Sequence, residues 1–89
     1  MVTAIILMNV ERSRINAIAD RLADMKEISE VFSVSGNYDL IAIVRVPRND
    51  DLAELVTHHL LTIEGLEKTN TLLAFKAYSR HDLEAMFSV

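Results

Sequence analysis

The sequence predicts an α+β fold in which strands and helices follow the order βαββαβ, with a short C-terminal helix after them. Two observations carry this prediction. Four segments with strand patterns are interrupted by two segments of helical periodicity. Residues 2–10 and 40–46 are apolar on both faces, which is typical of central strands that are covered on both sides. We expect residues 1–89 to form one domain, because 89 residues suffice for one compact core.

The first two elements are a strand over Val2–Val10 and a helix over Glu11–Met25. The strand is an apolar run rich in β-branched residues. The helix is indicated by apolar residues that recur at helical spacing and form one stripe. This stripe consists of Ile15, Ile18, Ala19, Leu22 and Met25. Ser13 is expected to cap the start of the helix, because its hydroxyl suits that position.

A β-hairpin is expected next, formed by strands over Ile28–Ser35 and Leu40–Val46. The first of these strands alternates and should be half exposed, with Ile28, Phe32 and Val34 on one face. The second is apolar on both faces. The residues between them, Gly36–Asp39, include the two residue types that best tolerate a positive φ, which favours a tight turn.

The second helix begins after Pro47, where three residues suited to helix starts occur together. These are Asn49, Asp50 and Asp51. Its buried stripe should consist of Leu52, Val56, Leu60 and Ile63, with Leu55 beside them. Gly65 is expected to end it.

A long fourth strand is expected over Glu67–Tyr78, with Thr69 and Thr71 on the same face. Ser79–Asp82 then has the pattern of a cap and first turn. It should lead into a short C-terminal helix whose apolar residues are Leu83, Met86 and Phe87.

This order of elements is that of a ferredoxin-like sandwich. Right-handed crossovers place the first and third strands in the middle of an antiparallel sheet, with both helices on one face. The other face of the sheet has no long helix to cover it, although the central strands are apolar there as well. We therefore expect this face to be buried against a second copy of the chain in a homo-oligomer.

Composition narrows the classes of function. The net charge of −4 disfavours direct binding to nucleic acid. The chain has no cysteine, which excludes disulfides and thiolate metal sites. The first apolar run is too short to span a membrane and has no basic segment before it, so we expect a cytoplasmic protein with no membrane partner.

Three motifs are better explained by structure than by chemistry. His58 and His59 are adjacent, so on a helix they point about 100° apart and do not chelate one metal ion together. His81 beside Asp82 lacks an activated nucleophile. Asn49-Asp50-Asp51-Glu54 lacks the alternating oxygen ligands of a calcium loop, and helix capping accounts for it. We expect no catalytic residue, metal or cofactor.

The turn at Gly36-Asn37-Tyr38-Asp39 carries the best candidate for a binding site. By itself it is most simply a hairpin turn. A glycine also lets a ligand approach the backbone, where free N–H groups can hold a carboxylate. Asp39 is suited to hold an ammonium group, and hydroxyls of Thr69 and Thr71 offer further contacts. Together these groups match a zwitterionic amino acid.

Two further patterns stand out: residues 34–40 read V-S-G-N-Y-D-L, and residues 63–71 read I-E-G-L-E-K-T-N-T. With them, the sequence resembles, over essentially the whole chain, the effector-binding and oligomerisation domain of the Lrp/AsnC, or feast/famine, transcriptional regulators, also called the RAM domain. It implies an ACT-like fold and dimers joined through their sheets. It also implies rings of dimers, often octamers, with amino-acid effectors bound in clefts between dimers.

Carried over by position, the resemblance implies a ligand site formed by six residues. These are Gly36, Asn37, Tyr38, Asp39, Thr69 and Thr71. Leu66 departs from the valine common in the family. The chain begins directly at the first strand, so it resembles a stand-alone version of the domain that lacks the helix-turn-helix. We expect it to bind no DNA alone, but to assemble with itself or with a full-length relative.

Two alternatives remain open on the sequence. One is a purely structural oligomerisation module with a vestigial site, and the other is a small enzyme on a ferredoxin-like scaffold. The apolar sheet face favours the first. The second follows only from the versatility of the fold, and the absence of a cofactor motif and of a nucleophile–base pair counts against it.

Overall fold

The computed structural model describes residues 1–78 and residue 80, and it confirms the predicted α+β, ferredoxin-like fold. Its four strands form one antiparallel sheet in the order β2-β3-β1-β4. They are β1 (Val2–Val10), β2 (Ile28–Ser33), β3 (Leu40–Val46) and β4 (Leu66–Leu73). The two strands predicted to be central are central. The predicted C-terminal helix lies outside the described residues.

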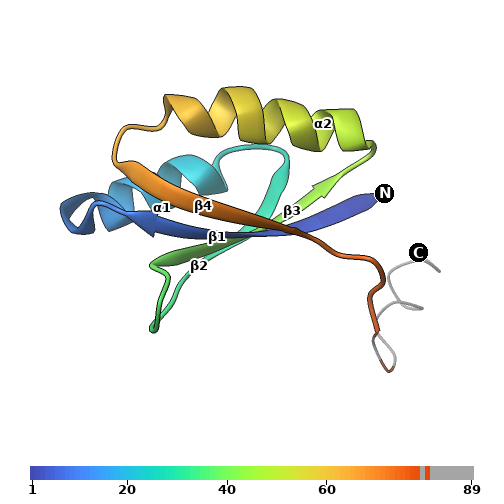
Figure 1. Cartoon of the computed structure of the whole chain (residues 1–89), viewed down its shortest axis with the longest axis horizontal. Helices are drawn as coiled ribbons and strands as arrows, with labels where there is room; N and C mark the ends of the chain where they lie inside the picture. The colour runs from blue at the N-terminus through green and yellow to red at the C-terminus, as the bar shows by residue number, and fades with distance from the viewer. Residues whose placement is uncertain (79, 81–89) are drawn as a thin grey trace.

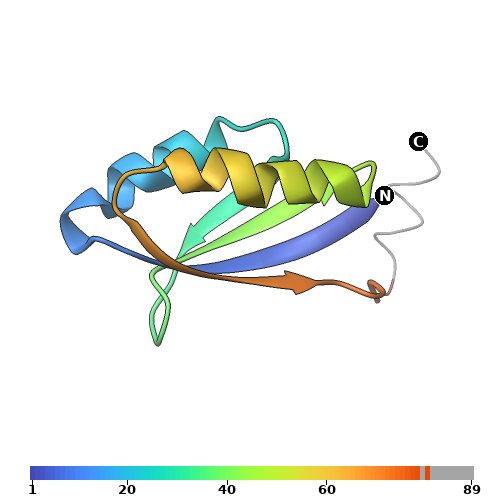
Figure 2. The ribbon, with the colours of Figure 1, turned by 45° about the horizontal axis from the view of Figure 1, so that its top comes forward.

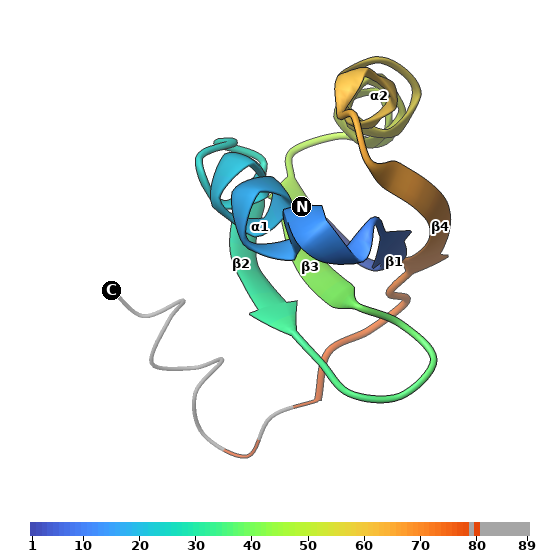
Figure 3. The same cartoon turned by 90° about the vertical axis from the view of Figure 1, so that its left-hand side faces the viewer.

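Two helical segments cover one face of this sheet (Figure 1). The first is η1 (Arg12–Arg14), a 3-10 turn, followed by α1 (Ile15–Ala23). The second is continuous and consists of α2 (Asn49–Glu54), the π-helical η2 (Leu55–His59) and the 3-10 turn η3 (Leu60–Thr62). Figure 3 shows α1 on the β2 side of the sheet and α2 on the β4 side. All of the helices lie in one layer, as Figure 2 also shows.

The core lies between this helical layer and the sheet. Alternate residues of β1 and β3 point into it, so that each strand is buried at every second position. The fully buried side chains include Ile6 and Met8 of β1 and Leu40 and Val44 of β3. From the helices, the core takes Ile18, Leu22, Leu55, Leu60 and Ile63. No polar side chain among the described residues is buried, so apolar burial alone holds this layer together.

The opposite face of the sheet, which we call the open face, is apolar along its middle. Its residues are those that alternate with the buried ones, and the helices do not cover them. They are Ile5 and Leu7 of β1, Ile41 and Ile43 of β3, Phe32 of β2 and Leu72 of β4. The four residues on β1 and β3 are half-buried, whereas Phe32 and Leu72 are exposed. Within residues 1–78 and 80, no helix covers this apolar face, as expected.

The start of the first helical segment differs from the prediction. Its apolar stripe is confirmed, with Ile18 and Leu22 buried. Ser13, however, lies within η1, and the residue before α1 is Arg14, whose side chain makes no capping bond. The segment also ends earlier, at Ala23 instead of Met25. A first turn tightened into 3-10 geometry moved the start of the α-helix beyond the serine.

The second strand also differs, because the alternation of the sequence breaks within it. Pairing with β3 shifts between Ile28 and Glu30, which places Glu30 opposite Ile43 and Val31 opposite Ala42. An irregularity of this kind changes which face the following residues occupy. Consequently Phe32 lies on the open face, not on the face of Ile28 as predicted. The strand ends at Ser33 instead of Ser35.

The second helical segment and the last strand keep their predicted places with changed details. Arg48 is the residue before α2, and the Asp51 carboxylate accepts its backbone N–H at 3.2 Å. Leu55, expected beside the buried stripe, is fully buried, whereas Leu52 and Val56 of that stripe are half-buried against the core. β4 ends at Leu73, not at Tyr78. The N–H of Ala74 still donates to the Thr3 carbonyl at 2.9 Å, but β1 begins at Val2 and so offers almost no further strand for pairing.

The two glycines provide a matched test of local strain, because both have positive φ. Gly36 has φ 105° with no atom within 4 Å of a Cβ, whereas a Cβ on Gly65 (φ 94°) lies 2.7 Å from Arg14 Cδ and 3.2 Å from Ile18 Cδ1. We expect Gly36→Ala to lower the free energy of unfolding by about 1 kcal/mol through the backbone alone. Gly65→Ala should cost about 2–3 kcal/mol, because crowding adds to it. Urea unfolding of the two variants measures the difference, and equal losses would contradict it.

Candidate ligand-binding site

Two hydrogen bonds fix the turn between β2 and β3 to the end of β1, and a third closes the turn on itself. The Asp39 N–H donates to the Met8 carbonyl at 2.9 Å, and the Asn9 side-chain amide donates to the Asn37 carbonyl at 2.8 Å. The Val34 N–H closes the turn on the Asp39 carbonyl at 3.1 Å. The turn projects toward the open face of the sheet (Figure 1). The predicted hairpin is therefore present, and its position is set by β1.

The Asp39 carboxylate already has a partner within the fold. Its Oδ2 accepts the Val10 N–H at 3.0 Å, and the bond is partly buried. The register of β1 with β3 ends at Met8 opposite Leu40, so Val10 lies beyond the last ladder pair on this side of β1. Asp39 therefore satisfies a backbone donor just past the end of the ladder, and it holds the end of β1 against the turn.

A hollow of about 590 Å³ opens beside this carboxylate and carries both signs of charge. Asp39 is the only one of the six predicted residues that lines it. The other lining residues are Asn9, Val10, Glu11, Arg12, Glu67 and Lys68. Arg12 and Lys68 supply cationic groups, and Glu11, Asp39 and Glu67 supply carboxylates. The hollow is open to solvent, and it has the size of sites that hold small molecules.

Gly36, Asn37 and Tyr38 lie outside this lining. Gly36 and Asn37 are exposed at the tip of the turn, and Tyr38 is half-buried. Arg12 and Lys68, which do line the hollow, were missed by sequence reasoning. Lys68 stands directly before the predicted threonine pair, which was the available signal, whereas nothing near Arg12 pointed to it.

Thr69 and Thr71 share one face of β4, as predicted, but that face is the one covered by helices. They pair with Met8 and Ile6 of β1, whose side chains are buried in the core. Thr69 lines a smaller hollow of about 130 Å³ between the second helical segment and β4, together with Leu60, Leu61 and other residues. The turn and the threonine pair thus lie on opposite sides of the sheet in one protomer, and the protomer does not bring them together.

The histidines of the second helical segment have a local partner. His58 Nδ1 lies 2.9 Å from Glu54 Oε2, one helical turn away, and both side chains are exposed. Within residues 1–78 and 80, the structure contains no group of three or more side chains suited to hold a metal ion. His81 and Asp82 lie outside the described residues. No helix in the same residues is long and apolar enough to cross a membrane.

The fold and the turn motif agree with a known family. The family model of the Lrp/AsnC ligand binding domain matches residues 3–83. The chain belongs to the Lrp/AsnC ligand-binding domain family. This Lrp/AsnC domain is 29% identical over 77 residues to the HTH-type transcriptional regulator FL11 of Pyrococcus furiosus, covering 86% of the chain and 50% of FL11. It is 32% identical over 84 residues to the uncharacterized HTH-type regulator YugG of Bacillus subtilis, covering 91% of the chain and 50% of YugG.

The Lrp/AsnC domain therefore spans about half the length of the curated relatives that it matches. Among solved structures, TTHA0845 from Thermus thermophilus superposes with a TM-score of 0.84 at 42% identity, over 90% of this chain and 100% of that one. The transcriptional regulator NMB0573 from Neisseria meningitidis, solved as a complex with L-Met, superposes with a TM-score of 0.80 at 15% identity, over 89% of this chain and 53% of that one. The second likeness concerns the fold alone.

Proposed function

We propose that this Lrp/AsnC domain is a sensor of free amino acids that assembles with itself and regulates transcription through that assembly. The observation that carries the proposal is the hollow beside Asp39, which presents cationic and carboxylate groups together in a chain of a ligand-binding family. A zwitterion needs both kinds of group, whereas a simple anion or cation needs one. The chain is then a regulatory module and not an enzyme, in keeping with relatives named as transcriptional regulators.

Each part of the proposed site has a defined task. The negative charge of Asp39 attracts the ammonium group, although its Oδ2 also accepts the Val10 N–H. Arg12 and Lys68 attract the carboxylate. The space around Gly36 is empty within 4 Å of where a Cβ would be, so a ligand can approach the exposed backbone of the turn.

The site becomes complete only when copies of the chain meet. Because the turn and the threonine pair lie on opposite sides of one sheet, we propose that Gly36–Asp39 of one copy and Thr69 and Thr71 of another face the same ligand. A ligand held in this way stabilises one arrangement of the copies over others, which is how a sensor acts through assembly. The L-Met complex of the Neisseria regulator is consistent with an amino acid as the effector.

The open face supports the assembly itself. A half-buried apolar surface along two central strands is suited to pack against the same surface of a second copy. We propose a dimer joined in this way, rings of such dimers, for example octamers, and assembly with a full-length relative that supplies DNA binding. The purely structural module is the competing function, because the open face alone favours it.

Asp39 separates the sensor from the structural module. We expect Asp39→Asn to keep the bond to the Val10 N–H, because the amide oxygen accepts it, and to keep the free energy of unfolding within about 0.5 kcal/mol. Its affinity for the cognate amino acid should fall about 10- to 100-fold, because a charge-assisted hydrogen bond is lost. Isothermal titration of the wild type with each of the twenty amino acids identifies the ligand, and titration of the variant measures the loss.

Asp39→Ala is the companion variant. It removes the acceptor as well as the charge, so the free energy of unfolding should fall by about 1–3 kcal/mol because a partly buried N–H is left unsatisfied. Equal affinity of wild type and Asp39→Asn would remove Asp39 from the site. No heat from any amino acid at millimolar concentration, with assembly intact, would favour the structural module.

A further inference from the structure

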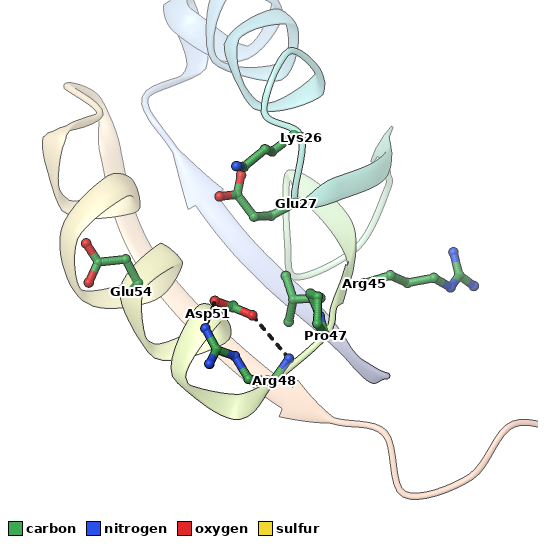
Figure 4. Close-up of a pocket in the computed structure, with 8 residues that line it drawn as sticks. Lys26, Glu27, Arg45, Pro47, Arg48, Asp51 and Glu54 are labelled. Carbon is green, nitrogen blue, oxygen red and sulfur yellow. Dashed lines mark hydrogen bonds and ion pairs between the residues drawn. The ribbon is translucent and has the colours of Figure 1, made fainter.

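A second hollow, of about 510 Å³, opens at the other end of the sheet. β2 begins there and β3 ends there, whereas the turn at Gly36–Asp39 joins the opposite ends of these strands. Two segments distant in sequence enclose the hollow: the turn before β2, and the stretch from the end of β3 to the start of α2 (Figure 4). Its apolar part is formed by Val46, which is 2% exposed, and Pro47. No sequence motif pointed to this place.

Six charged side chains line this hollow. Two of them have partners elsewhere. Arg45 points away from the rest and donates to the Ser29 hydroxyl at 3.1 Å, and Glu54 contacts His58. The four that remain are Lys26 and Glu27 on the β2 side and Arg48 and Asp51 on the α2 side.

Each side of the hollow therefore carries one cation and one carboxylate. On the α2 side, Arg48 and Asp51 form a loose pair with Nη2 3.6 Å from Oδ1, and the Arg48 side chain is 75% exposed. On the β2 side, Glu27 is half-buried and Lys26 is exposed. Asp51 Oδ2 also accepts the Arg48 backbone N–H at 3.2 Å. The Asp51 Oδ1 and the Arg48 guanidinium are joined only by the loose and exposed ion pair, so they are available to a ligand at small cost.

The balance of charges selects the class of ligand. A phosphate or other simple anion placed here would meet Glu27 and Asp51, and a simple cation would meet Lys26 and Arg48. A molecule with a carboxylate and an ammonium group satisfies one cation and one carboxylate at once. We propose that this hollow is a second binding site for a free α-amino acid, with its carboxylate toward Lys26 and Arg48 and its ammonium toward Glu27 and Asp51.

Such a site joins two parts of the fold that the backbone leaves separate. A bound amino acid bridges the turn after α1 and the start of α2, whereas the proposed site beside Asp39 lies at the opposite end of β2 and β3. The proposal shares with the proposed function its class of ligand, but no residue. Binding at exposed groups should be weak, in the millimolar range, so the second site responds when the amino acid is abundant.

Amide chemical shifts of the ¹⁵N-labelled full chain test this site directly. Titration with each of the twenty amino acids should move the amides of Ile28, Arg48 and Asp51 with a saturable, millimolar response. Glu27→Gln should weaken that response at least fivefold. Asp20→Asn, which removes an exposed carboxylate of α1 outside the hollow and away from the open face, is the control and should change nothing.

The outcomes at the two sites can be told apart. Shifts confined to residues 36–39 would overturn the second site and leave the proposed function standing. Shifts confined to Ile28, Arg48 and Asp51 would support the second site and count against the proposed site beside Asp39. Equal shifts with acetate or ethylamine alone would overturn the zwitterion as the ligand, as would no saturable shift at millimolar concentration.

Discussion

Replacing Leu7 with glutamate should prevent the proposed dimer and leave a folded monomer. Leu7 lies on the open face of β1, opposite Ile41 of β3 and Asn70 of β4, and is half-buried in the protomer. In a monomer, a glutamate there reaches water. In a dimer joined through the open faces, the carboxylate is buried without a partner, which costs about 3 kcal/mol or more. The dissociation constant of the dimer should therefore rise at least about 100-fold.

Sedimentation velocity over a range of concentrations measures this change, and circular dichroism shows whether the monomer is folded. Asn16→Glu is the matched control, because it places the same charge on the exposed side of α1, away from the open face. The control should assemble like the wild type. A Leu7→Glu variant that still dimerises at wild-type concentrations would show that the copies meet through another surface.

Replacing Leu55 with alanine should produce a large loss of protomer stability. Leu55 is fully buried in the core, where its side chain extends from the second helical segment toward the sheet. Deleting its buried methyl groups leaves a cavity, and such changes cost about 2–5 kcal/mol. Small domains have only about 5–15 kcal/mol of stability, so the variant should unfold at a clearly lower urea concentration.

Leu61 offers the matched control within the same helical segment. It undergoes the same change of atoms on mutation, but its side chain is 78% exposed. Leu61→Ala should change the free energy of unfolding by no more than about 0.5 kcal/mol. The two variants are compared at one protein concentration, because assembly adds to apparent stability. Similar losses in both would mean that the packing of η2 against the sheet is not as described.

Much of the fold was predictable because it depends on local pattern. The two-sided apolar runs of β1 and β3 identified the central strands, and the stripe through Ile18 and Leu22 identified the buried side of α1. The positive φ of Gly36 confirms the turn that its residue type indicated. These features follow from the spacing of side chains along one element, and that spacing is written in the sequence.

The prediction was less accurate where geometry departs from regular periods. The bulge in β2 moved Phe32 to the open face, and the second helical segment, which includes a π-helical turn, buries Leu55 more fully than Leu52. Both departures insert or shift a residue, and a shift of one residue in a strand reverses every face that follows it. Residue type alone marks neither position.

The sequence by itself determined the order of elements, the central strands, the uncovered apolar face and the residue types of the turn. Only the tertiary structure decided which groups meet. It brought the Asp39 carboxylate to the Val10 N–H, separated the threonine pair from the turn by the thickness of the sheet, and gathered Lys26 and Asp51 around one hollow. Periodicity describes neighbours along one element, whereas these contacts join segments whose separation depends on how the whole sheet and its helices pack.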